Sequence, residues 1–239
     1  MTVYAPWASP VFMASALLWV TVTVVTYAGA LWWYGRVRGN PFFVPVATTS
    51  AVVMLLLWVT QTPYRSYADA TMPLSFLVGP ATVALAVPLY AQMERLRRIW
   101  RPLLVALVVG CSVALLTAIG VAWALGGSWQ TLVSLAPKSA TMPIAMPMAD
   151  RLGGLPALAA VAVVITGVVG TIVSHPLLRL LRVRDPAARG FAIGLTAHAI
   201  GMARELQIHP TSGGFAALAM GLNGILTALL MPLALMLFR

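Results

Sequence analysis

A group of charged and hydroxyl side chains interrupts an apolar stretch between residues 137 and 151, which read PKSATMPIAMPMADR. Ser139 and Thr141 are helix-capping residue types, and Pro143 suits the first turn of a helix. A helix that begins near Thr141 would leave free backbone amides at its N-terminus, where the helix dipole favours an anion. Lys138 adds a positive charge beside them. We therefore predict a site for a small anion; the alternative is that Lys138 reaches the membrane interface and the prolines only end a helix.

A second polar interruption follows at residues 190 to 205, GFAIGLTAHAIGMARE. Positions at steps of four, three and four residues share one face of a helix, and here they hold Gly194, His198, Gly201 and Glu205. Arg204 lies on the adjacent flank, and both His198 and Arg204 can donate hydrogen bonds. Glycine and alanine alone would indicate only close helix packing. Because ionisable residues at membrane depth usually serve function, we expect His198 and Arg204 to face the anion from this second segment.

Other residues of the apolar segments are assigned supporting roles. Asn223, between two glycines of the last apolar run, can bond an unwound backbone or a substrate oxygen. If transport is coupled to protons or sodium, the coupling residues are expected among the few titratable groups of these segments, Asp150, His198 and Glu205. Hinges or close packing are expected at Gly79, Pro80, Pro143, Gly194 and Gly201.

Catalysis finds no support in the sequence. The chain lacks the HExxH, GxSxG and P-loop patterns, and the spacing of its acids and histidines matches no metalloprotease site. His175 and His209 each precede a proline and are expected to be structural. The single cysteine, Cys111, permits no intrachain disulfide. We expect neither an enzyme nor a resident cofactor or metal.

The composition specifies the elements that must position these residues. Hydrophobic residues make up 61% of the 239 and charged residues only 8%, whereas soluble domains carry about 25% charged residues. At about 20 residues for each membrane crossing, the length allows about six to eight helical segments. The sequence predicts one all-α polytopic membrane domain over residues 1–239, with N-terminal helices at 11–60 and a core at 71–239 that contains both interruptions.

Charge patterning predicts the orientation. The net charge is +10, but the arginines cluster in short segments between apolar runs, near residues 36–38, 95–101 and 179–189. Such clusters are typical of cytoplasmic loops, so no nucleic-acid partner is expected and the N-terminus is predicted to lie outside. With that orientation, residues 137–151 must enter and leave the bilayer on the same side, as a re-entrant hairpin. The tetrapeptide ATMP occurs at 70–73 and at 140–143, which is compatible with an internal repeat.

Five stretches resemble the LrgB family of bacterial membrane proteins, in family order across residues 65 to 235: FLVGPATVALAVPLY, PKSATMPIAM, GGLPALAAVAVVITGVVG, ARGFAIGLTAHAIGMARE and AALAMGLNGILTALLMPL. The resemblance implies a multi-span protein of the bacterial inner membrane, often paired with a small LrgA-type, holin-like partner. Family members are described as antiholin-like regulators of murein hydrolase activity and autolysis. Related proteins carry pyruvate or, in plastids, glycolate and glycerate. The chain departs from the family pattern at Pro147, where an acid is usual, and at Ala197, Met202 and Glu205.

Two functions therefore stand side by side. The leading hypothesis is a carrier for a small monocarboxylate that works by alternating access, with Lys138, Ser139, Thr141, His198, Arg204 and Asn223 as binding residues. An elevator-like arrangement and a homodimer are compatible with the family analogy. The alternative is a regulatory membrane protein that acts on an LrgA-type partner.

Overall fold

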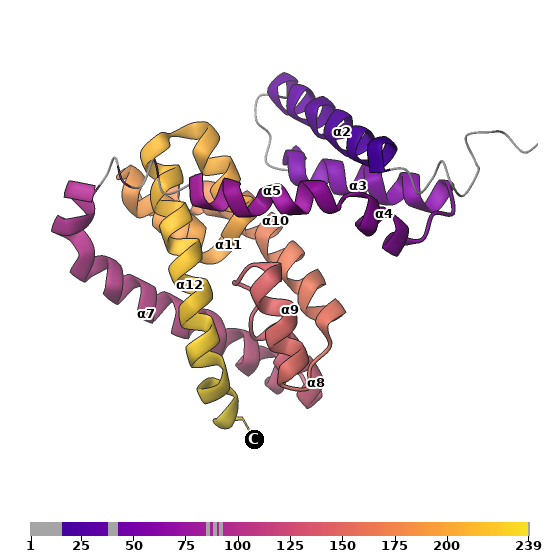
Figure 1. Ribbon diagram of the computed structural model, residues 1–239. Helices are drawn as coiled ribbons and strands as arrows, with labels where there is room; N and C mark the ends of the chain where they lie inside the picture. The colour runs from indigo at the N-terminus through magenta and orange to yellow at the C-terminus, as the bar shows by residue number, and fades with distance from the viewer. Residues whose placement is uncertain (1–15, 38–42, 85–86, 88–89, 91–92, 239) are drawn as a thin grey trace, which may run out of the picture. The chain divides into compact units, whose positions relative to one another are not determined.

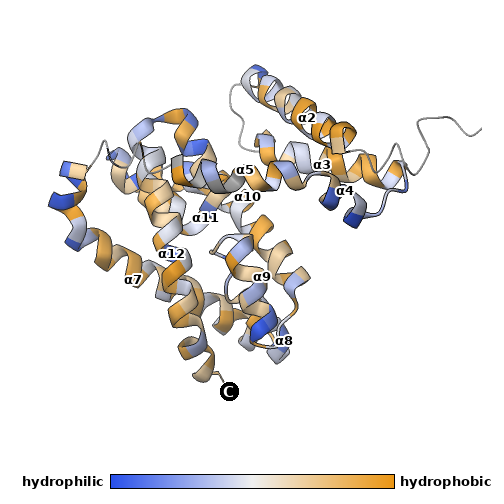
Figure 2. Cartoon of the chain, in the orientation of Figure 1, coloured by the Kyte–Doolittle hydropathy of each residue, from blue (hydrophilic) through white to orange (hydrophobic). Residues whose placement is uncertain are grey.

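The computed structural model describes residues 16–37, 43–84, 87, 90 and 93–238, and these residues form ten helices and no strand (Figure 1). Within them, four helices are long and apolar enough to cross a membrane: α2 (Ala16–Arg36), α7 (Met93–Ala124), α10 (Pro156–Leu180) and α12 (Pro210–Met236). Figure 2 shows apolar residues along most of their length. The predicted all-helical, multi-span class is confirmed at this level, while the re-entrant and elevator-like details stay predictions.

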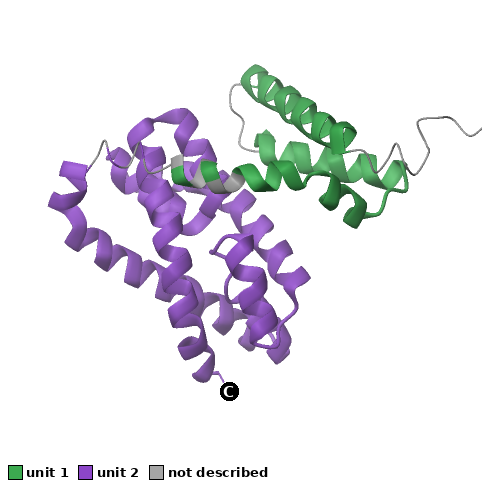
Figure 3. Ribbon diagram, in the orientation of Figure 1, with its two compact units in different colours: residues 1–84 green, residues 85–239 purple. Residues whose placement is uncertain are grey.

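The chain divides into two compact units, residues 1–84 and 85–239 (Figure 3). The first unit contains α2, α3 (Pro45–Val59), α4 (Tyr64–Ala70) and α5 (Met72–Ala84). Within it, α2 contacts α4 where Trp19 meets Tyr67 edge to face at 5.5 Å between ring centroids. The hydroxyls of Thr23 and Tyr67 share a hydrogen bond of 3.0 Å. These contacts pack α4 against α2.

The predicted hinge at Gly79 and Pro80 falls inside α5, which contains Pro80 as an interior proline. Proline removes a helical hydrogen bond and favours a kink. The surroundings of Gly79 lie outside the described part of the structure. Its hinge role stays a prediction.

The second unit begins with α7, which corrects one detail of the sequence analysis. The arginine-rich segment 94–101, expected to be a loop, is helical, because α7 starts at Met93 and runs for 32 residues. Glutamate, leucine and arginine are good helix formers, and Glu94 pairs with Arg98 one turn away at 2.6 Å. A helix of this length measures about 48 Å, so its basic first turns extend past an apolar layer of about 30 Å.

The two ends of α7 give the unit its orientation. At the start, Arg95 forms an ion pair with Asp185, the N-cap residue of α11 (Pro186–Ile208), so two arginine-rich segments meet at the same end of the unit. At the other end, Gly126 takes a positive φ of 76° and the chain turns into α8 (Trp129–Leu135). We call these the arginine-rich end and the α8 end. Figure 1 shows α8 at the far end of α7 from α11.

Glycines on α11 allow its close packing on α12. A Cβ atom at Gly190 would lie 2.0 Å from the carbonyl oxygen of Ser212, and one at Gly194 would lie 2.1 Å from that of Ala216. Any larger residue would force the two backbones apart. The fully buried Phe215 of α12 completes this contact within an apolar cluster. Gly194 thus lies at a close contact between α11 and α12.

Candidate functional site: two hairpins that meet at Asn223

The first interrupted segment folds back on itself. After α8, residues 136–141 form turns, and α9 (Met142–Arg151) begins with Thr141 as its N-cap and Pro143 in its first turn. The chain then returns to α8, because the Ser134 hydroxyl oxygen accepts a hydrogen bond of 2.7 Å from the backbone amide of Leu155. We call residues 128–155 the first hairpin. It belongs to the α8 end of the unit, and residues 136–141 form its tip.

The second interrupted segment is also a hairpin, folded at His198. His198 has φ 39° and ψ −131°, which no helix contains. A Cβ atom at Gly201 would lie 2.7 Å from the Ile193 side chain, although eight residues of straight helix span about 12 Å. The arms 186–197 and 199–208 therefore fold back on each other, with the tip at His198 and the base at the arginine-rich end. The predicted interruption is present. The predicted single helical face through Gly194, His198, Gly201 and Glu205 is wrong, because the helix breaks inside it.

Both tips are joined to α12 by one side chain, Asn223. Its amide nitrogen donates to the carbonyl oxygen of Ser139 in the first tip at 3.0 Å and to that of Leu195 in the second at 3.2 Å. In an unbroken helix the Leu195 carbonyl would bond to the amide of residue 199, so the break at His198 explains why it needs another donor. Asn223 is fully buried, and its amide oxygen has no hydrogen-bond partner among the described residues. We call this junction the tip site.

His198 fixes the second tip against α10. Its Nε2 lies 2.9 Å from the carbonyl oxygen of Val163, and because a carbonyl only accepts, Nε2 carries the proton. The imidazole packs where a Cβ at Gly167 would stand, 2.6 Å from its Cε1 atom. His198 is 3% exposed. The structure thus gives this predicted binding residue a positioning contact with α10.

The first tip carries the features that favour an anion. The backbone of Thr141 is extended, and its side chain makes no capping hydrogen bond, so the first amides of α9 keep their hydrogen-bonding capacity. Lys138, the only lysine in the sequence, lies partly buried in the same tip, and no acid lies within ion-pair distance of it in the described structure. Ser139 is buried. A lysine and a helix N-terminus together give this tip a positive potential.

The other predicted residues lie away from the tips. Asp150 is exposed near the C-terminal end of α9, about 12 Å along the helix axis from its first residue. Arg204 donates to the carbonyl oxygen of Thr171 on α10 at 3.2 Å. Glu205 is 1% exposed and belongs to a separate polar cluster at the base of the second hairpin. The structure therefore brings Ser139 and Asn223 together and separates Arg204 and Glu205 from them.

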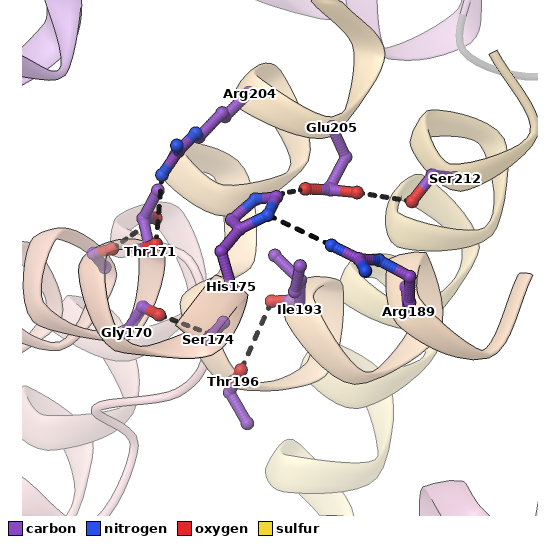
Figure 4. A network of polar contacts seen from close by, with 11 residues as sticks. Gly170, Thr171, Ser174, His175, Arg189, Ile193, Thr196, Arg204, Glu205 and Ser212 are labelled. Carbon is purple, nitrogen blue, oxygen red and sulfur yellow. Dashed lines mark hydrogen bonds and ion pairs between the residues drawn. The ribbon is translucent and has the colours of Figure 1, made fainter. Parts of the chain in front are cut away.

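Figure 4 shows this second cluster, which we call the base cluster: His175, Arg189, Glu205 and Ser212. His175 Nε2 lies 2.8 Å from Glu205 Oε1, and Ser212 donates to Oε2 of the same carboxylate. Arg189 Nη2 lies 3.1 Å from His175 Nδ1. Of these four residues, the sequence indicated a functional role only for Glu205, and His175 was expected to be structural. The partners of Glu205 lie 30, 16 and 7 residues away along the chain, so no local spacing could have indicated the cluster.

The fold and the site define a class of protein. It is a multi-pass helical membrane protein in which two broken segments, one from each end of the second unit, meet at a buried amide on the last long helix. Irregular backbone of this kind is tolerated at membrane depth only where protein or a cavity surrounds it.

Comparison with known proteins then gives the family. The LrgB-like family model matches residues 23–237, and the chain belongs to this family. An uncharacterised protein of Haemophilus influenzae is 34% identical over 184 residues, which are 77% of this chain and 80% of that protein. Antiholin-like protein LrgB of Bacillus cereus is 28% identical over 214 residues, 90% of this chain and 93% of the relative, and the Bacillus anthracis protein of that name matches equally. No solved structure matches.

Proposed function

We propose that this protein carries a small monocarboxylate across the bacterial inner membrane by alternating access, and that it binds this substrate at the tip site. The observation that carries the proposal is the Asn223 amide, which holds the interrupted backbones of both hairpins at one buried point. Paired interrupted segments from the two halves of a repeat are the best structural pointer to a transporter's binding site. A protein that only packed its helices would not need to break two of them.

The charges of the tip site support an anionic substrate. The returning arm of each hairpin starts at its tip, so the N-termini of α9 and of the arm 199–208 both begin there. Helix N-termini carry about half a positive elementary charge. Lys138 adds a whole one, and Lys138, Ser139 and Thr141 are the proposed carboxylate ligands.

The unpartnered oxygen of Asn223 supports a preference within the monocarboxylates. It is an acceptor, so a carboxylate cannot satisfy it, whereas a hydroxyl beside the carboxylate can. We therefore expect glycolate and lactate to bind better than acetate. Tight packing next to the tips, where a Cβ at Gly224 would lie 2.5 Å from the Ile144 side chain, fits a substrate of few atoms.

The orientation follows from the arginines. Because the Arg95–Asp185 ion pair brings two arginine-rich segments to one end of the second unit, we place that end in the cytoplasm and the α8 end outside. With this placement the first hairpin enters from outside and the second from the cytoplasm, and the N-terminus lies outside. The same proposal includes an elevator-like movement of the hairpin pair, coupling of transport to protons or sodium, and a homodimer.

A second function rests on the relatives. The Bacillus proteins are named antiholin-like, which supports a regulatory subunit that acts with an LrgA-type, holin-like partner on murein hydrolase activity. The two functions differ in whether this chain alone moves solute.

Reconstitution of the full chain into proteoliposomes tests the proposal. Exchange (counterflow) of labelled glycolate or lactate should be measurable with this chain alone. Lys138→Ala should lower it strongly, while Lys138→Arg, which keeps the charge, should retain more of it. Arg204→Ala measures the contribution of the second hairpin. No flux of any monocarboxylate, with or without an LrgA-type partner, would overturn the carrier and leave the regulatory function.

A further inference from the structure

The base cluster contains the most deeply buried acid of the protein. The sequence has five acidic residues, and Glu205 alone among them is buried in the described structure, at 1% exposure. A buried carboxylate is costly unless it is paired and hydrogen-bonded. Here one oxygen accepts a hydrogen bond from Ser212, and the other lies 2.8 Å from Nε2 of His175 (Figure 4). The tip site uses none of these groups.

The hydrogen-bond chemistry of arginine specifies the protonation state of the cluster. An arginine guanidinium only donates and stays charged, so the His175 Nδ1 that faces Arg189 must accept and carries no proton. The proton of a neutral imidazole then lies on Nε2, the atom that faces Glu205 at 2.8 Å. With this assignment, a charged arginine and a charged carboxylate lie on either side of a neutral histidine. This is the proton-free state of the cluster.

The cluster joins α10, both arms of the second hairpin and α12 at the base of that hairpin. His175 belongs to α10, Arg189 to the first arm, Glu205 to the second arm and Ser212 to α12. A Cβ at Gly190, next to Arg189, would collide with the Ser212 backbone, so the first arm and α12 are already in contact there.

Other charged or titratable groups on these elements have their own contacts or are exposed. Arg204 bonds the Thr171 carbonyl on α10, and His209 caps α12 by accepting from the Thr211 amide. Asp185 pairs with Arg95 of α7, and Arg179 of α10 is exposed. Arg189 and Glu205 are the charges that face His175 directly.

We propose that the base cluster is a proton-binding site that controls the opening of the second hairpin. A proton from the arginine-rich side adds to His175 Nδ1, which then becomes a donor and can no longer accept from Arg189. Two positive groups now face each other, so Arg189 leaves for the interface and releases the first arm from α10. Glu205 stays paired with the resulting imidazolium, and loss of the proton restores the contact. This inference deepens the proposed function, because it assigns the coupling ion and names His175 and Glu205 rather than Asp150 or His198 as its site.

The protonation state is tested directly by NMR of the full chain in micelles with ring-labelled histidine, titrated between about pH 5 and 8. His175 is assigned by its loss in His175→Asn, and His198 and His209 serve as internal references. We expect a neutral ring with the proton on Nε2 at the upper end and protonation of Nδ1 on acidification. A proton on Nδ1 at the upper end, or one unchanged state across the range, would overturn the inference.

The coupling is tested in proteoliposomes by comparing accumulation driven by a pH gradient with counterflow at equal pH. In Glu205→Gln and in His175→Asn, the ratio of gradient-driven accumulation to counterflow should fall about tenfold, within the usual range of a coupling between sites. His209→Asn is the matched control, because asparagine also caps a helix, and it should leave the ratio unchanged. Ser212→Ala removes one bond only and should give an intermediate ratio.

The two proposals fail in different ways. If the ratio of accumulation to counterflow in both cluster variants equals that of the parent chain, the proton site is overturned and the carrier proposal stands. Absence of counterflow in the parent chain would instead overturn the carrier, and the NMR titration would still decide the proton site.

Discussion

Replacing Asn223 by leucine tests whether the two hairpins are held together at the tip site. Leucine has nearly the same size but cannot donate, so the variant loses both bonds, to Ser139 at 3.0 Å and to Leu195 at 3.2 Å. It also removes the unpartnered amide oxygen, which by itself would stabilise the variant. The net effect depends on what the two carbonyl groups can find instead.

The magnitude follows from the loss of alternative partners. Hydrogen bonds between membrane helices average only about 0.6 kcal/mol, with a maximum near 1.7, because the separated helices find other partners. The Leu195 carbonyl has already lost its helical partner at the break, and an unsatisfied buried acceptor costs about 1–3 kcal/mol. We therefore expect Asn223→Leu to destabilise the protein by about 2–4 kcal/mol. For a chain of this size that lowers the melting temperature by about 5–15 °C.

The chain contains its own reporter for this measurement. Cys111 is the only cysteine, is 1% exposed and lies on α7 in the same compact unit. A thiol-reactive fluorophore in detergent will therefore report unfolding of that unit as the sample is heated. Gln207→Leu, which removes an exposed amide from α11, is the matched control and should change stability by no more than about 0.5 kcal/mol. If Asn223→Leu melts together with that control, the amide does not hold the hairpins and the tip site is refuted.

Three further predictions follow from the same contacts. Gly194→Ala should destabilise the protein by about 1–3 kcal/mol or more because its Cβ meets a backbone carbonyl of α12 at 2.1 Å. The control Gly221→Ala, whose Cβ meets nothing within 4 Å, should be neutral or stabilising by up to about 1 kcal/mol in the same thermal assay. Equal melting temperatures of the two variants would contradict the close packing. Ser134→Ala should cost about 1–2 kcal/mol because the Leu155 amide loses its acceptor at the base of the first hairpin, and a threonine there should recover part of it. Glycolate should compete with labelled substrate about tenfold better than acetate because acetate leaves the acceptor of Asn223 unpaired, and equal competition would remove the amide from the binding site.

The position of the first interruption was predictable because it depends on residue types that act locally. Proline disfavours continuation of the helix that precedes it, so the prolines of PKSATMPIAMPM predicted a break, and α9 starts at Met142 with Pro143 in its first turn as the capping pattern indicates. Pro147, by contrast, lies inside α9. The all-helical class followed from the composition. The family followed from stretches that keep their order along the chain, and the family model matches residues 23–237.

The partners of each interruption were not predictable from spacing. Helical periodicity placed Glu205 on a face with His198, but the positive φ of His198 ends that periodicity. A non-glycine residue in such a sparsely populated conformation costs about 1–3 kcal/mol, so it persists only because tertiary contacts such as the bond to the Val163 carbonyl hold it. Those contacts join residues 35 positions apart, and no local pattern encodes them. The prediction of a loop at 94–101 was wrong for another reason. The charges of that segment indicated its side of the membrane but did not indicate that its backbone is helical.

Arg189 of the base cluster and Leu195 of the tip site lie on the same arm, 186–197, and this gives the second hairpin a means of coupling the two sites. Leu195 follows Arg189 by six residues, about 9 Å along a helix axis. An unbroken helical arm of that length moves as one piece, since its hydrogen bonds do not stretch independently. A change of charge at His175 that frees the base would therefore shift the tip, where Asn223 holds the Leu195 carbonyl. Conversely, an anion at the tip site that shifts Leu195 would shift Arg189 relative to His175. Reciprocity of this kind is what linkage requires of any two coupled sites, and here a single rigid arm is sufficient to transmit it.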